Sequence, residues 1–229
     1  MLGNRYSPVV NLIPPPQDFS SEIASIQSGD IWGFDTIGYS PQNIPMKEWV
    51  EYSKLKMEQF TPSNALTIFK NDRGLHFAPL VDLSGITSMV EMFYDCHSLV
   101  VVPLYDTSNV MNMGSTFKYC SSLTTISQFD VSSLTNMYLT LSGCTSLQFA
   151  LIKNIGKSTL TTYDFSGASV WGTGSEENRQ SLIDSLITYS YDRASNGMAT
   201  ATIKLSATTK ALLTEEEIAQ ITNKGFTIS

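Results

Sequence analysis

The stretch that decides the fold is Asp106-Thr-Ser-Asn-Val-Met-Asn-Met-Gly-Ser-Thr-Phe-Lys-Tyr-Cys-Ser-Ser-Leu-Thr-Thr-Ile126. Its pattern recurs every 24 residues, so that Asp82, Asp106, Asp130 and Asn154 begin four successive units. A fixed period of about 20 to 50 residues is typical of a solenoid. A unit of this size cannot bury its own apolar face, so neighbouring units must stack. The period therefore predicts one core shared by all the coils.

The predicted repeat core consists of four apolar positions in each of three units. They stand 7, 11, 14 and 17 residues after the start of a unit and are Met89, Phe93, Cys96, Leu99, Met113, Phe117, Cys120, Leu123, Met137, Leu141, Cys144 and Leu147. Spacings of three and four residues favour helical or 3₁₀ turns. The segment Leu123-Thr-Thr-Ile126 then predicts a short strand in each coil. Stacked strands would form a parallel ladder about 20 Å long.

Three segments follow from the extent of the repeat. Residues 75–172 form the solenoid, and residues 1–74 do not match the period and form a separate N-terminal segment of unassigned fold. Residues 173–229 form a C-terminal cap, because the last coil of a stack needs cover. The predicted fold class is therefore α/β: a short solenoid with a parallel strand ladder, a C-terminal α/β cap and a separate N-terminal segment.

The cap has clear start and stop signals. A helix is expected from Ser175 through Ile187, with acidic residues at its N-terminal end. Strands are expected at residues 201–205 and 226–228. Between these strands, Thr214 and Glu217 have the spacing of a capping box, and Gly225 suits the left-handed position after a helix.

Composition and charge exclude several classes of partner. The chain has 229 residues, of which 42% are hydrophobic and only 15% are charged, and its net charge is −7. Nucleic-acid binding needs clustered Lys and Arg to neutralise phosphates, so no nucleic-acid partner is expected. No stretch approaches about 18 consecutive apolar residues, so no membrane span is expected. The first residues lack an apolar run of signal-peptide length, so secretion by the ordinary route is not expected, unless a longer precursor has been trimmed.

The three cysteines share one phase of the repeat and are expected to be buried free thiols. A disulfide or a metal site is the alternative. His76 and His97 have no ligand spacing, and His97 is expected to be a solvated loop residue. The recurrent aspartates suggest a calcium ladder or, more simply, turns in which the carboxylate accepts from backbone N–H groups two or three residues later. No metal and no cofactor is expected.

The chain carries no recognisable catalytic motif. It has no Gly-x-Ser-x-Gly, no His-Glu-x-x-His and no phosphate-binding loop. We therefore expect a protein that is not an enzyme. A catalytic site of unrecognised type within residues 1–74 is the alternative.

The repeat closely resembles that of bacterial BspA-like leucine-rich-repeat proteins. The hallmark is a Thr-Ser-Asn-Val-x-Asn-Met stretch followed by Met-Phe-x-x-Cys-x-Ser-Leu. It is matched here by residues 109–113 and 117–123, and one unit earlier by residues 92–99. The third unit departs from it with Leu141 in place of Phe but keeps Cys144-Thr-Ser-Leu147. The resemblance covers residues 75–172 and implies a leucine-rich-repeat solenoid. It also implies adhesion or protein binding at bacterial surfaces, and related repeats occur in phage virion proteins.

We therefore expect a protein-interaction or structural module of a phage virion, as a fibre, tail or capsid-decoration protein. Residues 1–74 would attach it, through virion subunits or self-association, and the solenoid would be displayed. Aromatic residues are enriched at protein interfaces, which makes four of them the candidate interface: Trp32, Phe34, Trp49 and Phe60. These aromatics could instead cap the first coil. The alternative function is a bacterial cell-surface adhesin, with a host surface receptor as partner.

Overall fold

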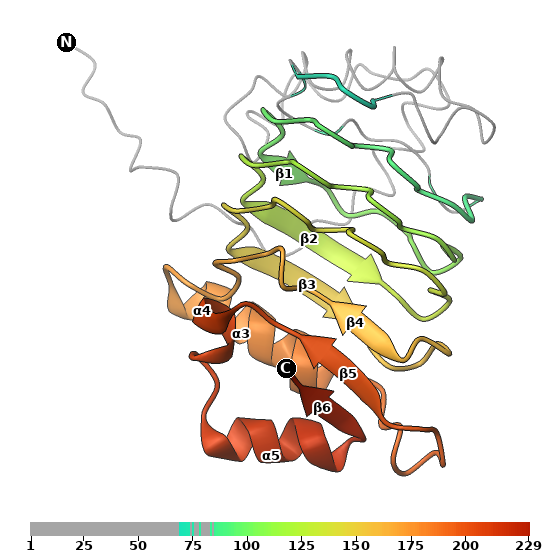
Figure 1. The fold of residues 1–229 in the computed structure, drawn as a ribbon, viewed down its shortest axis with the longest axis vertical. Coiled ribbons are helices and arrows are strands. Elements are labelled where there is room, and N and C mark those ends of the chain that lie inside the picture. The colour runs from blue at the N-terminus through green and yellow to red at the C-terminus, as the bar shows by residue number, and fades with distance from the viewer. Residues whose placement is uncertain (1–68, 74, 76–77, 79–82, 84) are drawn as a thin grey trace, which may run out of the picture.

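The computed structural model describes residues 69–73, 75, 78, 83 and 85–229 (Figure 1). The fold is mixed α/β, with two three-stranded parallel sheets in the orders β1-β2-β3 and β4-β5-β6. The strands are β1 (Val101–Val102), β2 (Thr125–Asp130), β3 (Phe149–Lys153), β4 (Thr162–Asp164), β5 (Ala201–Lys204) and β6 (Phe226–Ile228). The helices are α3 (Glu176–Ile183), the π-helical turn η3 (Asp184–Thr188), α4 (Ala207–Lys210) and α5 (Glu215–Asn223).

The first sheet is built on the 24-residue period. Val101 pairs with Thr125, and Thr125 pairs with Phe149, so each strand lies one period from its neighbour. Figure 1 shows the successive passes of the chain lying one against the next in sequence order. Strand β2 begins two residues later than the expected strand, because the Leu123 N–H is still held in a turn by the Cys120 carbonyl at 3.1 Å.

A second series of backbone pairings, made of single bridges, joins the same coils at another position of the 24-residue unit. Ser88, Asn112 and Asn136 form parallel bridges, again one period apart. The expected strand in every coil is wrong for the fourth unit, since β4 lies out of phase with β1–β3 and begins the second sheet. The backbone groups of β3 that a fourth strand would need are already bonded to the cap and to the fourth unit itself. Ile152 N–H donates to Ser185 Oγ at 2.8 Å, and the indole N–H of Trp171 donates to the Ala150 carbonyl at 3.2 Å.

The turns between strands are not the helical or 3₁₀ turns that the spacing predicted. Hydrogen bonds from residue i to i−3 do recur, as from Met92 N to Met89 O at 3.1 Å. However, two residues in each coil adopt a left-handed backbone. The first is Glu91, Ser115 or Leu139, with φ between 56° and 57°, and the second, four residues later, is Asp95, Tyr119 or Gly143. A left-handed residue interrupts a helix. The three-and-four spacing therefore arises from a series of separate turns.

All twelve residues of the predicted repeat core are between 0% and 6% exposed. The rings of Phe69, Phe93 and Phe117 stack in a row, with centroids 5.2 and 5.4 Å apart. Phe69 stands one period before Phe93, so the stacked coils begin before Leu75, where the sequence boundary had been placed. In the third coil Leu141 replaces the ring, and Phe117 stacks instead on Phe129 at 5.5 Å.

The cap follows its sequence signals closely. Ser175 caps α3, and the capping box of Thr214 and Glu217 begins α5. Gly225 is left-handed, with φ of +89°, and β6 follows it. Helix α3 contacts β3, and Figure 1 places α5 at the far end of the stack. The sequence did not indicate η3, α4 or the parallel pairing of β6 with β5.

Candidate interaction surfaces

The residues predicted from sequence fall into two groups. The candidate interface residues Trp32, Phe34, Trp49 and Phe60 lie outside the described residues, as do His76 and Asp82, so their predicted roles stay predictions. The twelve core residues lie inside the stack, where they hold the coils together. Any interaction surface in the described part of the chain must therefore come from other residues.

The three thiols are free and buried, and each bonds to the preceding coil. Cys96, Cys120 and Cys144 donate to the carbonyls of the aromatic residues 27 positions earlier, at 3.0 to 3.1 Å. Burial raises the pKa of Cys96 and of Cys144 to about 12, and it raises the pKa of Cys120 as well. The thiols therefore remain protonated donors that satisfy carbonyls turned into the core.

The recurrent aspartates form turns, as expected. Asp106 Oδ1 accepts from Ser108 N at 3.0 Å, and Asp130 Oδ1 accepts from Ser132 N at 2.8 Å. Asn112 accepts in the same way from Gly114 N at 3.0 Å. These oxygens already have backbone donors. Among the described residues, no group of three or more His, Cys, Asp or Glu side chains is placed to hold a metal ion.

His97 lies in a polar cluster between coils. Its Nε2 is 2.5 Å from Asp95 Oδ1, and its Nδ1 is 3.3 Å from Ser121 Oγ. Arg73 donates to the same Asp95 at 2.7 Å, and this hydrogen bond is the main cause of the lowered pKa of Asp95. His97 is thus a loop residue whose side chain is 43% exposed, as expected, but it is also paired with Asp95.

The order Ser121–His97–Asp95 matches that of a hydrolase triad, but the neighbouring amides do not suit catalysis. The Ser121 N–H donates to the Tyr119 carbonyl at 2.9 Å, and the Ser122 N–H donates to the His97 carbonyl at 3.3 Å. Acyl transfer needs free donors aimed at the developing oxyanion. These two amides are already used, and the His97–Ser121 contact links two neighbouring coils.

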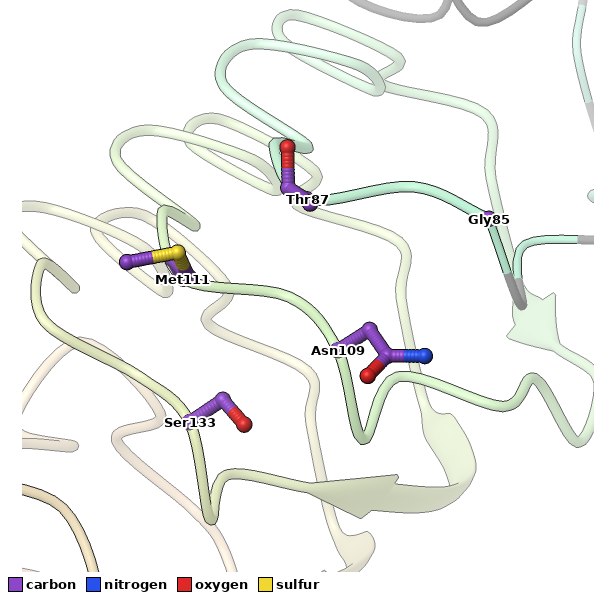
Figure 2. A pocket seen from close by; sticks show the side chains of 5 residues that line it. All are labelled: Gly85, Thr87, Asn109, Met111 and Ser133. Carbon is purple, nitrogen blue, oxygen red and sulfur yellow. The ribbon is translucent and has the colours of Figure 1, made fainter.

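A shallow open groove of about 460 Å³ crosses three coils (Figure 2). It is lined by Gly85, Thr87, Asn109, Met111 and Ser133, which come from three neighbouring passes of the chain. None of the five side chains carries a charge. Met111 is 48% exposed, although Met is usually a core residue. The groove therefore offers one apolar contact in a neutral polar surface.

A second group of side chains lies on the turns, and we call it the Tyr–Lys site: Tyr94, Lys118, Tyr119 and Leu139. Tyr119 is 43% exposed and the other three residues are half-buried. Lys118 Nζ lies 5.0 Å from the centroid of the Tyr119 ring and 5.8 Å from that of the Tyr94 ring. The two rings meet edge to face with centroids 5.7 Å apart. Such distances are those of cation–π contacts.

Sequence reasoning missed both surfaces because it followed what the repeats share. The sequence feature that could have revealed these surfaces is a residue at which one unit differs from the other units. Met111 stands where the adjacent units have Thr87 and Thr135. Tyr119 likewise stands where they have Asp95 and Gly143. A departure at an exposed phase cannot be explained by core packing and so points to another role.

Comparisons with known proteins give a partial match. A family model described as "Mycoplasma protein of unknown function, DUF285" matches residues 67–173. The match includes Phe69, in agreement with a stack that begins before residue 75. No curated protein and no solved structure matches the chain. No helix among the described residues has both the length and the apolar character needed to cross a bilayer.

Proposed function

We propose that this protein is a non-enzymatic protein-interaction module whose stacked units are leucine-rich repeats of the BspA-like type. The 24-residue register of β1, β2 and β3 supports the repeat assignment, and so does the burial of the residues that the repeat shares. Stacked repeats present extended surfaces to partners, and function then depends on side chains that the stacking does not need.

The groove is the observation that carries the proposal. Met111 exposes its apolar side chain on a surface where the periodic residues are Thr, and the surrounding lining is neutral. A Met side chain adapts its shape and is common on promiscuous binding surfaces. A partner held there is selected by shape and polar contacts, so its binding should depend little on salt.

Binding of the purified chain to intact bacterial cells and to purified phage particles tests the role. We expect saturable binding by the native protein and loss of binding by Met111→Lys. Met111→Thr restores the periodic residue and should also weaken binding. The matched control Thr208→Lys changes an exposed residue of α4 and should bind normally. Native-like binding by Met111→Lys contradicts a role for the groove.

Two locations are compatible with this role. In a virion, residues 1–74 would attach the protein and the coils would be displayed. On a bacterial cell the same module would be an adhesin. Immunogold labelling of virions and of cells distinguishes them.

Attachment itself can be tested by deleting residues 1–66. The deletion must end there because Phe69 stacks on Phe93, and its carbonyl accepts from Cys96 at 3.0 Å. Loss of association with particles or cells supports attachment through this segment. Unchanged association, with lower solubility alone, shows that the segment is a cap.

A further inference from the structure

Lys118 is a cation without a carboxylate partner in the described part of the chain. Lys70, which stands two periods before it, forms an ion pair with Glu91 at 2.5 Å. The residue equivalent to Glu91 for Lys118 is Leu139, because both pairs are separated by 21 residues. The second pair therefore keeps the lysine and replaces the acid with an apolar side chain.

The backbone shows that the two pairs are equivalent in space as well as in sequence. Asn71 N–H donates to the Tyr94 carbonyl, and Tyr119 N–H donates to the Ser142 carbonyl, each at 2.8 Å. These bonds link the same phases of neighbouring coils. The unpaired charge of Lys118 thus results from the substitution at position 139 and does not reflect a different local fold.

Two residues of the Tyr–Lys site have an unfavourable backbone conformation. Tyr119 and Leu139 have φ of 68° and 57°, a region that large side chains rarely adopt. At the phase of Tyr119 the other coils have Asn71, Asp95 and Gly143, which are residue types that tolerate it. Gly143 also leaves room for the ring, since a Cβ there would lie 3.1 Å from Tyr119 Cδ1. The conformation of Leu139 is shared by Glu91 and Ser115, so only the strain at Tyr119 is specific to this coil. Strain of this kind is concentrated at functional sites.

We propose that the Tyr–Lys site binds a protein partner through an Asp or Glu carboxylate flanked by an aromatic or aliphatic side chain. The carboxylate pairs with Lys118, and the flanking side chain packs on Tyr94, Tyr119 and Leu139. An apolar rim around one desolvated charge pair is the arrangement of a binding hot spot. Leu139 favours a protein side chain over a sugar as the occupant, because it adds an aliphatic contact where the Lys70 pair has the acid Glu91. This inference is independent of the groove.

The probe is a random copolymer of Glu and Tyr, measured by calorimetry against the full-length protein. Two polymers serve as controls. Polyglutamate carries carboxylates without aromatic rings, and polygalacturonate carries carboxylates on sugar units. The chain carries a net charge of −7 and repels polyanions in general, so binding of the copolymer reports a local site. We expect the copolymer to bind at least about tenfold more tightly than either control, with an affinity that falls as salt increases.

Leu139→Glu is the decisive variant, because it recreates the Lys70–Glu91 arrangement and neutralises Lys118 within the molecule. It should weaken copolymer binding by about tenfold or more, as should Lys118→Gln. The matched control Thr208→Glu adds the same charge on α4 and should bind within about twofold of the native protein.

Tyr119→Asn separates binding from folding. Asn suits the left-handed backbone, so the melting temperature should be unchanged or higher, whereas copolymer binding should fall by about fivefold or more. The proposal is overturned by native-like binding of Leu139→Glu, by equal binding of polyglutamate, or by no copolymer binding at all. Equal or tighter binding of polygalacturonate also overturns it and assigns the site to an acidic sugar. The two proposals can fail separately. Met111→Lys changes the groove alone, so it should leave copolymer binding at the Tyr–Lys site unchanged.

Discussion

At the scale of single residues, the stack depends on side chains that touch their own equivalents in the next coil. Phe93 and Phe117 lie ring against ring, and each cysteine thiol bonds to the carbonyl beside the ring of the coil before it. Thr116 makes a similar link, since its Oγ1 lies 2.8 Å from the carbonyl oxygen of Met89. Every such position is thus constrained by two neighbours.

Phe117→Ala should therefore be strongly destabilising. Phe117 is fully buried and contacts rings on both sides, so its loss leaves a cavity that the stack cannot close. We expect the free energy of unfolding to fall by about 3–5 kcal/mol, measured by chemical denaturation. Tyr138→Ala removes a side chain from a residue that is 72% exposed and should change it by less than about 0.5 kcal/mol. Similar effects of the two variants would contradict the stacking.

The thiols should be unreactive and should make stability depend on alkaline pH. In the folded state the pKa of Cys96 and of Cys144 is raised to about 12 from an ordinary value of 9.0. The folded state holds these protons more tightly, so the stability they contribute is complete below pH 9 and is lost as the pH rises towards 12. Between pH 9 and pH 12, the free energy of unfolding of the native protein should fall by up to about 1.4 kcal/mol per pH unit for each of these thiols.

A variant with all three cysteines changed to Ala should show a shallower loss of stability above pH 9. Thiol titration gives an independent check: no fast-reacting thiols in the native state and three after denaturation. Fast reaction without denaturant would contradict the buried ladder.

At the scale of elements, local signals determine where helices begin, whereas turns depend on the repeat. Helix α5 begins at a complete capping box, with Glu217 N–H donating to Thr214 Oγ1 at 3.2 Å and Thr214 N–H donating to the Glu217 carboxylate at 2.8 Å. Left-handed residues in the turns include Glu91, Ser115 and Leu139, none of which favours that conformation intrinsically. Glu91 and Ser115 are held there by N–H bonds to the next coil, to the Gly114 carbonyl at 3.1 Å and the Tyr138 carbonyl at 2.8 Å.

Thr214→Ala should lower the free energy of unfolding by about 1 kcal/mol, because it leaves the first N–H groups of α5 without a side-chain acceptor. Thr222→Ala is the control within the same helix. Its hydroxyl donates to the Ile218 carbonyl at 2.8 Å, a bond that helix formation does not need. Thermal and chemical denaturation of both variants should show a clear difference, and equal effects would count against the cap.

At the scale of the whole molecule, the end of the stack is held by a buried charge. Arg193 is 2% exposed and donates to the carbonyls of Gly156, Ser158 and Ala199 at 2.7, 3.0 and 2.8 Å. These contacts join the last coil to the cap. Gly156 is required beside them, since a Cβ there would lie 2.3 Å from the Phe226 ring.

Arg193→Met should therefore separate the cap from the coils. Two buried carbonyls, those of Gly156 and Ser158, and the partly buried carbonyl of Ala199 lose their donor, and we expect a loss of about 3–5 kcal/mol in the free energy of unfolding. Arg179→Met removes a partly exposed ion pair to Glu217 between α3 and α5 and should cost less than about 1 kcal/mol. Proteolysis should cut the Arg193→Met variant first near residues 154–160. Protection equal to that of the native protein would show that the cap is held by other contacts.

The period by itself determined which residues of the coils are buried. Met113, Phe117, Cys120 and Leu123 recur at one spacing, and a residue that recurs apolar in every unit can only serve the shared core. Capping signals determined α3 and α5 in the same way, because a cap depends on side chains three residues apart.

Only the tertiary structure decided where the strand ladder ends, that Phe69 belongs to the stack, and that Lys118 lacks the acid that Lys70 has. Each of these depends on contacts between residues more than 20 positions apart in the chain. The period predicts that neighbouring coils touch, but which exposed side chains find a partner there is settled by the packed arrangement. The candidate interaction sites lie at such positions, where one coil departs from the pattern of the others.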